Sequence, residues 1–249
     1  MKNLESLAAI STLCLLFFSA CKKTADDYQT QMGKEYFPLA VGKFIEYEMD
    51  STIFDPDGDS LVYSTKTLAK EVVVDTLHDN NDSVLYKIER YERTADSLPW
   101  RVTKVFTQSI LANQAIRTED NLRFVKLAFP LTKGTRWNGN SAFNEELIVT
   151  VAGESLEMFK DWSYRVLAVN EPQGVGSFQF DETATVQEAA SENLIELRRS
   201  KSVYAKSIGL VYRELWILDT QCIDDCAGLP WEEKAEKGFI LKQTILNHN

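Results

Sequence analysis

Histidine is almost absent from this chain of 249 residues, which contains only His78 and His248. A Ser-His-Asp or Cys-His catalyst needs an imidazole that is held in place. Neither histidine promises one, because His78 sits in the turn-like stretch LHDNND and His248 is the next-to-last residue. The nucleophile-elbow, zinc-protease and phosphate-loop signatures are also missing. Among 37 acidic residues, nothing singles out the facing pair that a glycoside hydrolase needs, so the sequence disfavours an enzyme.

The sequence also lacks an apolar run long enough to cross a bilayer as a helix. The longest run, residues 7–18, is interrupted only by Ser11 and Thr12. It is well short of the roughly 20 residues that a spanning helix needs, and it has the length of a secretory h-region, roughly 7–15 residues. Lys2 supplies a positive start, although Glu5 weakens it. We therefore predict that residues 1–20 form a signal helix that is removed and takes no part in the fold.

The end of this run carries a more specific pattern. Phe18-Ser19-Ala20-Cys21 resembles the lipobox of bacterial lipoproteins, in which small residues precede an obligatory cysteine, although Phe18 stands where Leu is usual. The resemblance implies that a diacylglyceryl group is attached to the Cys21 thiol and that cleavage leaves Cys21 as the acylated first residue. Two or more acyl chains hold a protein firmly, at about 0.8 kcal/mol per buried CH₂. The alternative is a buried cysteine near an ordinary cleavage site.

The residues after Cys21 bear on the location. Lys22 is not the Asp that tends to mark retention in the inner membrane, and residues 22–27, KKTADD, look like the short export tag of Bacteroidota-type surface lipoproteins. The resemblance implies a lipid-anchored protein of the outer membrane, on either its periplasmic face or the cell surface. Because residues 21–35 are polar and lack hydrophobic periodicity, we predict that they form a lipidated, flexible tether.

Basic residues are outnumbered. There are 27 Lys and Arg against 37 Asp and Glu, which gives a net charge of −10 and an isoelectric point near 4.9. This balance argues against nucleic acid and against anionic lipid surfaces as partners of the folded body. Contact with the membrane is then expected through the N-terminal lipid, while a protein, apolar or glycan ligand stays open.

Cysteine is scarce as well, with four in the whole chain. Cys14 leaves with the signal segment and Cys21 is acylated, so Cys222 and Cys226 remain, in the stretch CIDDC. An exported protein meets an oxidising compartment, and we therefore predict a disulfide between them, worth about 2 kcal/mol for so short a loop. A metal site would need further Cys or His ligands nearby, and we expect no cofactor.

Period-two alternation dominates the rest of the chain. In KFIEYEMDSTI, Ile45, Tyr47 and Met49 share one parity and the acidic residues hold the other, as in a strand with one wet face. Similar stretches recur, separated by turn-rich segments such as HDNNDS and NEPQG, and no long Gly/Ser/Pro linker divides them. We predict an all-β fold, an antiparallel sandwich or (half-)barrel, formed by one domain over residues 36–249. Only EEKAEK and ESLEMFKDW look helical, and each would be short.

One segment has an internal echo. FPLAVGKF (residues 37–44) is matched by FPLTKGTRW (residues 129–137), in which Pro fixes an extended entry and Gly permits a tight turn. The two copies reflect either duplicated β units or one turn used twice. Together with YAKSIGLVYRELW (residues 204–216), they resemble a group of uncharacterised Bacteroidota-type lipoproteins, although Phe44 stands where Trp is common. This resemblance implies a fold and a location, and supplies no reaction.

The stretch DPDGDS is the best metal candidate in the chain. Asp55, Asp57 and Asp59 alternate as at the start of a calcium loop. However, Gly58 falls too early for an EF-hand, and Lys66 occupies the twelfth position, where a bidentate Glu is expected. The simpler interpretation is a hairpin turn in which Asp-Gly provides a positive φ. We therefore predict a turn and no metal site.

The five tryptophans either line a sugar or lipid groove or fill a β core, and the core is the commoner role for residues spread along strands. They are Trp100, Trp137, Trp162, Trp216 and Trp231. The observations together predict a non-enzymatic binding or assembly module on a lipid anchor, one version of which shelters an apolar ligand. The alternative is a surface-exposed hydrolase acting on glycans. A deep apolar cavity favours the first and a shallow cleft with two facing carboxylates favours the second.

Overall fold

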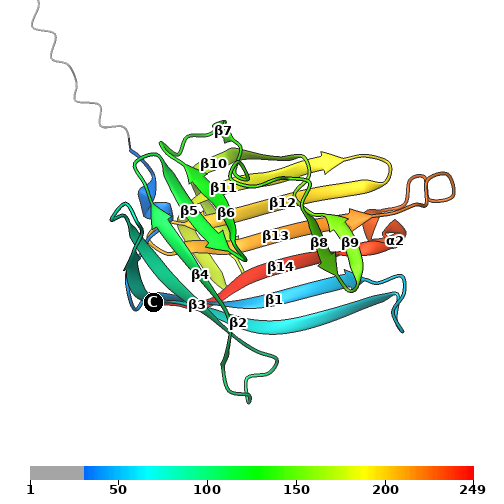
Figure 1. Cartoon of the computed structure of the whole chain (residues 1–249), viewed down its shortest axis with the longest axis horizontal. Coiled ribbons are helices and arrows are strands. Elements are labelled where there is room, and N and C mark those ends of the chain that lie inside the picture. The colour runs from blue at the N-terminus through cyan, green and yellow to red at the C-terminus, as the bar shows by residue number, and fades with distance from the viewer. Residues whose placement is uncertain (1–30) are drawn as a thin grey trace, which may run out of the picture. The chain divides into compact units, whose positions relative to one another are not determined.

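A single curved antiparallel sheet dominates the protein in a computed structural model that describes residues 31–249 (Figure 1). The strands are β1 (Phe44–Phe54), β2 (Val62–His78), β3 (Val84–Arg93), β4 (Arg101–Ile110), β5 (Gln114–Glu119), β6 (Leu122–Ala128), β7 (Arg136–Trp137), β8 (Ile148–Val151), β9 (Glu154–Glu157), β10 (Trp162–Val175), β11 (Phe178–Glu192), β12 (Glu196–Ala205), β13 (Gly209–Asp219) and β14 (Lys237–His248). Two short helical turns, η2 (Lys34–Tyr36) and α2 (Trp231–Lys234), complete the elements of the described residues.

The order of the strands divides the sheet into two similar halves. Twelve strands run in the order β6-β5-β4-β3-β2-β1-β14-β13-β12-β11-β10-β7, and β8 and β9 pair separately. Strands β1 to β6 are the first meander, and β7 with β10 to β14 are the second meander. Each meander has six strands joined in sequence order, as expected where turn-rich segments separate short alternating stretches.

The two meanders meet at both of their free edges, so that the sheet curls almost into a closed barrel. At one junction β1 pairs with β14 along most of its length. At the other, the Val125 N–H donates to the Gly139 carbonyl oxygen at 2.8 Å, and the Trp137 indole N–H donates to the Val125 carbonyl oxygen at 2.8 Å. The all-β, antiparallel prediction is confirmed, and of its two versions the barrel is the correct one.

The two FPL segments occupy equivalent places in this architecture. Each precedes the first strand of its meander, and each turns at a glycine, Gly42 with φ +90° and Gly134 with φ +91°. The Gly42 N–H donates to the Val73 carbonyl oxygen on β2 at 2.8 Å, and the Gly134 N–H donates to the Val166 carbonyl oxygen on β10 at 2.9 Å. The shared sequence thus encodes the same turn bonded to the second strand of each meander.

The second meander contains an insertion where the first has only a turn. Strand β1 leads to β2 through residues 55–61, whereas β7 leads to β10 through residues 138–161, which carry the β8–β9 hairpin. Leu156 and Phe159 of this insertion are buried in the largest hydrophobic core cluster, with Trp162 and Tyr164 of β10. The helix suggested for ESLEMFKDW is therefore wrong, because its apolar side chains pack from a strand and a turn. The other suggested helix is one turn, α2, which ends inside EEKAEK.

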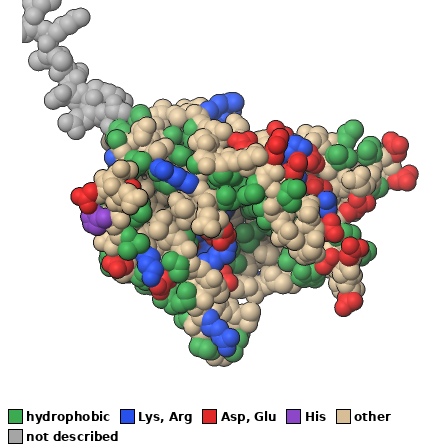
Figure 2. All heavy atoms as spheres, viewed as in Figure 1, with side chains coloured by type: hydrophobic (Ala, Val, Ile, Leu, Met, Phe, Trp, Pro, Cys, Tyr) green, Lys and Arg blue, Asp and Glu red, His purple; other side chains and the backbone are tan. Residues whose placement is uncertain are grey.

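Most of the negative charge gathers at one end of the barrel. In an antiparallel meander the β1–β2 and β13–β14 connections lie at the same end, because β1 pairs antiparallel with β14. Residues 55–61 and 220–236 hold eight Asp and Glu and one Lys, or −7 of the chain's net −10. Figure 2 shows Asp and Glu side chains gathered at the right-hand end of the view, where Figure 1 places these connections. We call this the acidic end.

The chain enters the folded body at the opposite end. The Leu131 N–H donates to the Met32 carbonyl oxygen at 2.9 Å, and the Ser207 N–H, in the β12–β13 connection, donates to the Glu35 carbonyl oxygen at 2.8 Å. Met32 and Glu35, which lie inside the segment predicted as a tether, thus contact the body. The predicted signal helix and Cys21 lie outside the described residues. Over residues 31–249, no helix is long and apolar enough to cross a membrane.

Candidate functional site

The three aspartates proposed from the sequence lie in the connection between β1 and β2. The Asp57 N–H donates to Asp55 Oδ1 at 3.3 Å, which closes a turn with a side chain. Gly58 does not have the expected positive φ. A Cβ on Gly58 would lie 2.6 Å from Asp55 Oδ2, so that a larger residue there would require the Asp55 carboxylate to move. Asp55, Asp57 and Asp59 lie in this turn, and among residues 31–249 no group of three or more His, Cys, Asp or Glu is arranged to hold a metal ion.

The cysteines and tryptophans play structural roles. Cys222 and Cys226 are joined by a disulfide in the connection between β13 and α2, with their Cα atoms 5.6 Å apart. Trp162, Trp216 and Trp231 are buried in hydrophobic clusters, with 4%, 8% and 6% of their surfaces exposed. Trp137 packs against the largest cluster, and the Trp100 ring stacks under the Arg93 guanidinium at 4.3 Å. They do not form one aromatic groove.

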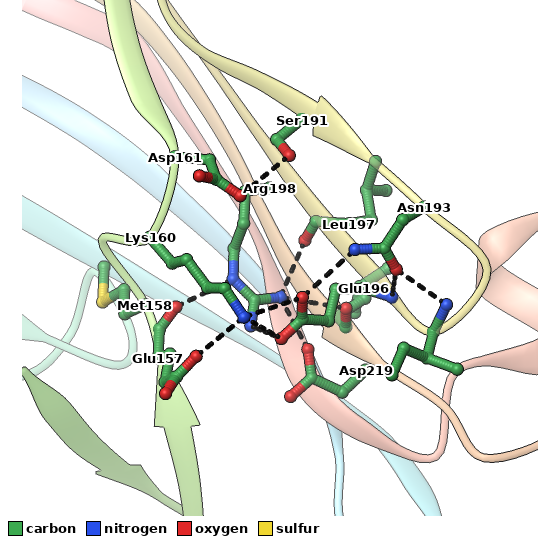
Figure 3. Close-up of polar contacts among 12 residues, drawn as sticks. Glu157, Met158, Lys160, Asp161, Ser191, Asn193, Glu196, Leu197, Arg198 and Asp219 are labelled. Carbon is green, nitrogen blue, oxygen red and sulfur yellow. Dashed lines mark hydrogen bonds and ion pairs between the residues drawn. The ribbon is translucent and has the colours of Figure 1, made fainter. Parts of the chain in front are cut away.

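A buried arginine fastens the β8–β9 insertion to the second meander (Figure 3). Arg198 is 2% exposed, and its Nε donates to the Glu157 carbonyl oxygen at 2.9 Å. Its Nη1 donates to Asp219 Oδ1 at 2.6 Å, and Lys160 bridges Glu157 and Glu196 beside it. Arg198 Nη2 forms no hydrogen bond and lies 3.7 Å from Glu196 Oε1, but the other groups pair with one another and with strand carbonyls, so we interpret this cluster as a structural clamp.

The barrel contains an interior cavity of about 80 Å³ between the two meanders. One end of it is apolar and is formed by Leu39 from the first FPL segment, Ile45 from β1 and Ile208 from the β12–β13 connection. These side chains are partly exposed, and we call them the rim. The rim belongs to the end of the barrel at which the chain enters, opposite the acidic end.

The deeper wall of the cavity is polar and carries an excess of positive charge. Four cations line it: Arg90, Arg117, Lys126 and Arg213, whereas Lys43 lies beside the rim, where its Nζ donates to the Ser207 carbonyl oxygen at 2.8 Å. Glu71 also lines the deeper wall, and Glu119 and Glu188 form ion pairs with the lining cations. Four cations against these three carboxylates leave a local net charge of +1 inside a chain whose net charge is −10.

On the first meander, Glu71 on β2 joins Arg90 on the neighbouring strand β3 and Arg117 on β5. Arg117 donates to both of its carboxylate oxygens, each at 3.0 Å, and Arg90 Nε donates at 3.1 Å. Arg117 Nε also donates to Glu119 at 2.8 Å, and its guanidinium lies 3.6 Å from the centre of the Phe106 ring. Burial alone would raise the pKa of Glu71, but Arg117 and Arg90 outweigh it and lower that pKa. On this side of the cavity, Glu71 is therefore ionised, and both of its carboxylate oxygens accept hydrogen bonds from the arginines.

A second network reaches across the interior from the first meander to the second. Lys126 on β6 forms an ion pair with Glu188 on β11, and Glu188 also accepts from Ser200 at 2.6 Å and Ser202 at 3.1 Å. Arg213 Nη2 lies 3.5 Å from Glu188 Oε2. Burial would raise the pKa of Glu188, but Lys126 and Arg213 outweigh it and lower it to about 2.

The pKa of the lysine in this pair is also lowered. Burial lowers the pKa of Lys126 to about 8, despite the neighbouring Glu188. We regard the pair as ionised at neutral pH, because the pKa of Lys126 still lies above 7 and Glu188 has three further donors.

Two buried donors beside this network have no partner. Arg213 Nε and Gln243 Nε2 are both buried and form no hydrogen bond. Gln243 is only 2% exposed, and both residues line the cavity. They face each other directly across β13 and β14. The arrangement offers hydrogen-bond donors and positive charge to a small group that can accept.

The sequence interpretation did not anticipate this wall, although the alternation contained a signal. In VLYKIER, Ile88 and Arg90 share the inward parity, as do Phe124 and Lys126 on β6. A charged residue in register with the inward-facing apolar residues of a strand is expected to point into the interior. The alternation alone does not show which residue of another strand lies opposite it.

Comparisons with known proteins identify no family for this chain. No family model matches it, and no curated protein matches it. Two solved structures are similar. One is a putative exported protein with a YmcC-like fold from Bacteroides fragilis, with 10% identity, a TM-score of 0.35, and coverage of 85% of this chain and 98% of that one. The other is a putative lipoprotein from Parabacteroides distasonis, with 8% identity, a TM-score of 0.31, and coverage of 86% and 98%. At these TM-scores the likeness carries no argument about function.

Proposed function

We propose that the protein is a lipid-anchored outer-membrane lipoprotein of the cell envelope, and that it acts as a non-enzymatic binding module whose ligand sits inside the barrel. The observation that carries the binding role is the cavity with unpartnered donors in its wall, Arg213 Nε and Gln243 Nε2. Both residues line the cavity, and an unpaired buried donor costs about 1–3 kcal/mol, so an acceptor group bound there would recover this cost.

The alternative, a hydrolase acting on glycans, has no comparable support in the described residues. Such an enzyme needs one carboxyl group whose pKa is raised so that it can protonate the leaving group. The carboxylates around the cavity have the opposite property. Arg117 and Lys126 hold Glu71 and Glu188 ionised, and both pKa values are lowered. The binding role is therefore the one we develop.

The anchor is supported by the sequence FSAC, which ends the signal-like segment at Cys21. The test is Cys21→Ser, with Cys14→Ser as the matched control inside the same segment. We expect Cys21→Ser to abolish palmitate labelling and release the protein from the outer-membrane fraction, and Cys14→Ser to leave both unchanged. Equal labelling of the two variants would exclude the anchor.

The ligand is tested by native mass spectrometry of the full protein purified from its own envelope. We expect a bound small molecule, and we expect Ile208→Trp, which places a large ring at the rim, to remove it. The control is Val105→Trp on the outer face of β4, where the side chain is 53% exposed. A protein without any bound molecule, or one that keeps it in Ile208→Trp, would argue against ligand storage in this cavity.

A further inference from the structure

We infer that Arg213 and Gln243 form the binding site for an oxyanion group, a carboxylate or a phosphate, on a ligand whose short apolar part lies toward the rim. This inference rests on the proposed binding role and adds the chemical class of the ligand. It is carried by the position of these two side chains and by two of their nitrogens, Arg213 Nε and Gln243 Nε2, which are buried and form no hydrogen bond.

The two residues are placed to act on one group. Arg213 on β13 and Gln243 on β14 are paired directly in the antiparallel register. Directly opposed residues on one face have Cβ atoms about 4.5–5.5 Å apart. Both side chains line the same cavity. One small group is therefore within reach of both, from two strands of the rigid second meander.

The two unpaired nitrogens require a ligand group that accepts hydrogen bonds. Arg213 Nε and Gln243 Nε2 are N–H donors, and a guanidinium has no acceptor to offer. The nearby carboxylate, Glu188, is already engaged with Lys126, Ser200 and Ser202, and meets Arg213 through Nη2 rather than Nε. The donors thus remain available, and a group with two acceptor oxygens satisfies both.

The charge of the cavity selects an anion among acceptors. Lys126, Arg117 and Arg90 are balanced by Glu71, Glu119 and Glu188, so that the charge of Arg213 is the one left in excess beside these ion pairs. Charge-assisted hydrogen bonds to a buried anion are stronger than bonds to a neutral carbonyl. A neutral acceptor would leave the excess charge uncompensated in a region of low dielectric.

The size of the cavity limits the rest of the ligand. Its volume of about 80 Å³ is roughly half of the 150 Å³ of an engineered cavity that binds benzene. It therefore holds an oxyanion and a few carbon atoms. Beyond these the ligand meets Leu39 and Ile208 of the rim, which are apolar and partly exposed.

The test uses three probes with the same four-carbon tail: butyrate, butyl phosphate and butanol. Each is titrated into the full mature lipoprotein in a neutral maltoside detergent, with calorimetry and the melting temperature as readouts. We expect at least one anion to bind and raise the melting temperature, and butanol to do neither. Tighter binding of butyrate identifies a carboxylate and tighter binding of butyl phosphate identifies a phosphate. Butanol binding as well as both anions would overturn the inference.

Substitution of Gln243 separates recognition from folding. Gln243→Leu removes one unpaired donor, so the melting temperature without ligand should stay the same or rise. The affinity for the anion should fall about 10- to 100-fold, which corresponds to about 1.5–3 kcal/mol for a hydrogen bond to a charged group. Gln108→Leu is the control, since Gln108 lines the cavity from β4 and is not one of the buried unpaired donors. Equal affinity in Gln243→Leu and the unmodified protein would overturn the inference.

A second variant adds an internal occupant. Gln243→Glu places a carboxylate beside Arg213 Nε, and we expect it to raise the melting temperature and abolish anion binding. Unchanged anion binding would contradict the assignment of this pair. A neutral molecule found in the purified protein by native mass spectrometry, together with no anion binding, would overturn the oxyanion class while leaving the proposed binding role intact.

Discussion

The two meanders share a topology and differ in what they place inside the barrel. The inner face of the first meander carries the ion network of Glu71, Arg90 and Arg117, and its main apolar cluster is small. The inner face of the second meander is mostly apolar, and residues such as Val186 and Ile217 are fully buried. Similar turns and strand order thus support two kinds of interior, and the cavity lies where they meet.

The comparison shows which features belong to the fold and which belong to the site. Alternation and FPL turns are common to both halves, so they specify the barrel. The inward charged residues differ between the halves, and in the second meander Glu188 pairs with Lys126 of the first, while Arg213 lies beside Glu188. Charged residues at inward positions are therefore the part of the sequence that carries the ligand chemistry.

The largest effect should come from removing the centre of the first network. Glu71→Ala leaves Arg90 and Arg117 buried without their shared partner, and breaking a buried pair in this way costs about 3–5 kcal/mol. Urea unfolding of the mature protein measures the loss. Glu48→Ala is the control, because its partner Lys66 is well exposed and surface pairs contribute about 0–1 kcal/mol. A loss below about 1 kcal/mol for Glu71→Ala would mean that the first meander does not depend on this network.

Acid should weaken the interface between the meanders next. The pKa of Glu188 is lowered from 4.5 to about 2, so its contribution is fully present above pH 4.5 and is lost as the pH falls toward 2. The shift corresponds to about 3 kcal/mol at most, in the same direction as the contribution of Glu71. Urea unfolding at pH 6 and pH 3 measures the difference, which should shrink in Glu188→Gln. An unfolding free energy independent of pH over this range would contradict the ionised interior.

The disulfide should contribute less. It lies in the long connection between β13 and β14, where the first meander joins β5 to β6 through Asp120 and Asn121, both at positive φ. The double variant Cys222→Ser/Cys226→Ser should lower the unfolding free energy by no more than about 2 kcal/mol. Chemical reduction of the unmodified protein should reproduce the effect. A loss of more than twice this size would show that the connection holds the barrel together.

The smallest effect should be the same in both halves. Gly42→Ala and Gly134→Ala each place a side chain at a positive φ with no neighbouring atom within 4 Å of the added Cβ. The cost is then the backbone conformation alone, about 1–2 kcal/mol. We expect the two variants to agree to within about 0.5 kcal/mol, the usual limit for independent sites. A large difference would show that the two FPL turns share a geometry but contribute unequally to the free energy of unfolding.

Much of the fold was predictable from local patterns. Alternation such as that of Ile45, Tyr47 and Met49 located strands, because a strand with one wet face has a period of two. The FPL segments located the starts of the two meanders. The closure of the barrel was not predictable. It depends on hydrogen bonds such as that between Val125 and Gly139, which join the edges of the two meanders, and no local sequence pattern indicates which edges pair. The choice between sandwich and barrel therefore needed the structure.

The candidate site was less predictable than the fold. Cys222 and Cys226 were recognisable from spacing and compartment alone. Arg213 and Gln243 were not, because each looks like a solvent-facing residue until the register shows that both share an inward face with Leu215 and Leu241. Their role depends on residues from β2, β5, β6 and β11 that approach only when the sheet closes. The pairing of strand edges that are distant in the sequence thus closes the barrel and also brings the residues of the site together.

The acidic end has a consequence for how the molecule stands on a membrane. A net charge of −7 lies at the end of the barrel that is remote from Met32, where the chain enters the folded body. For a molecule held by the proposed lipid on Cys21, we expect repulsion from anionic headgroups, which acts over about 10 Å at 0.1 M salt, to favour orientations with the acidic end away from the membrane. In such an orientation the rim would lie on the side of the bilayer. An amphipathic anion leaving the membrane would meet the open end of the cavity first.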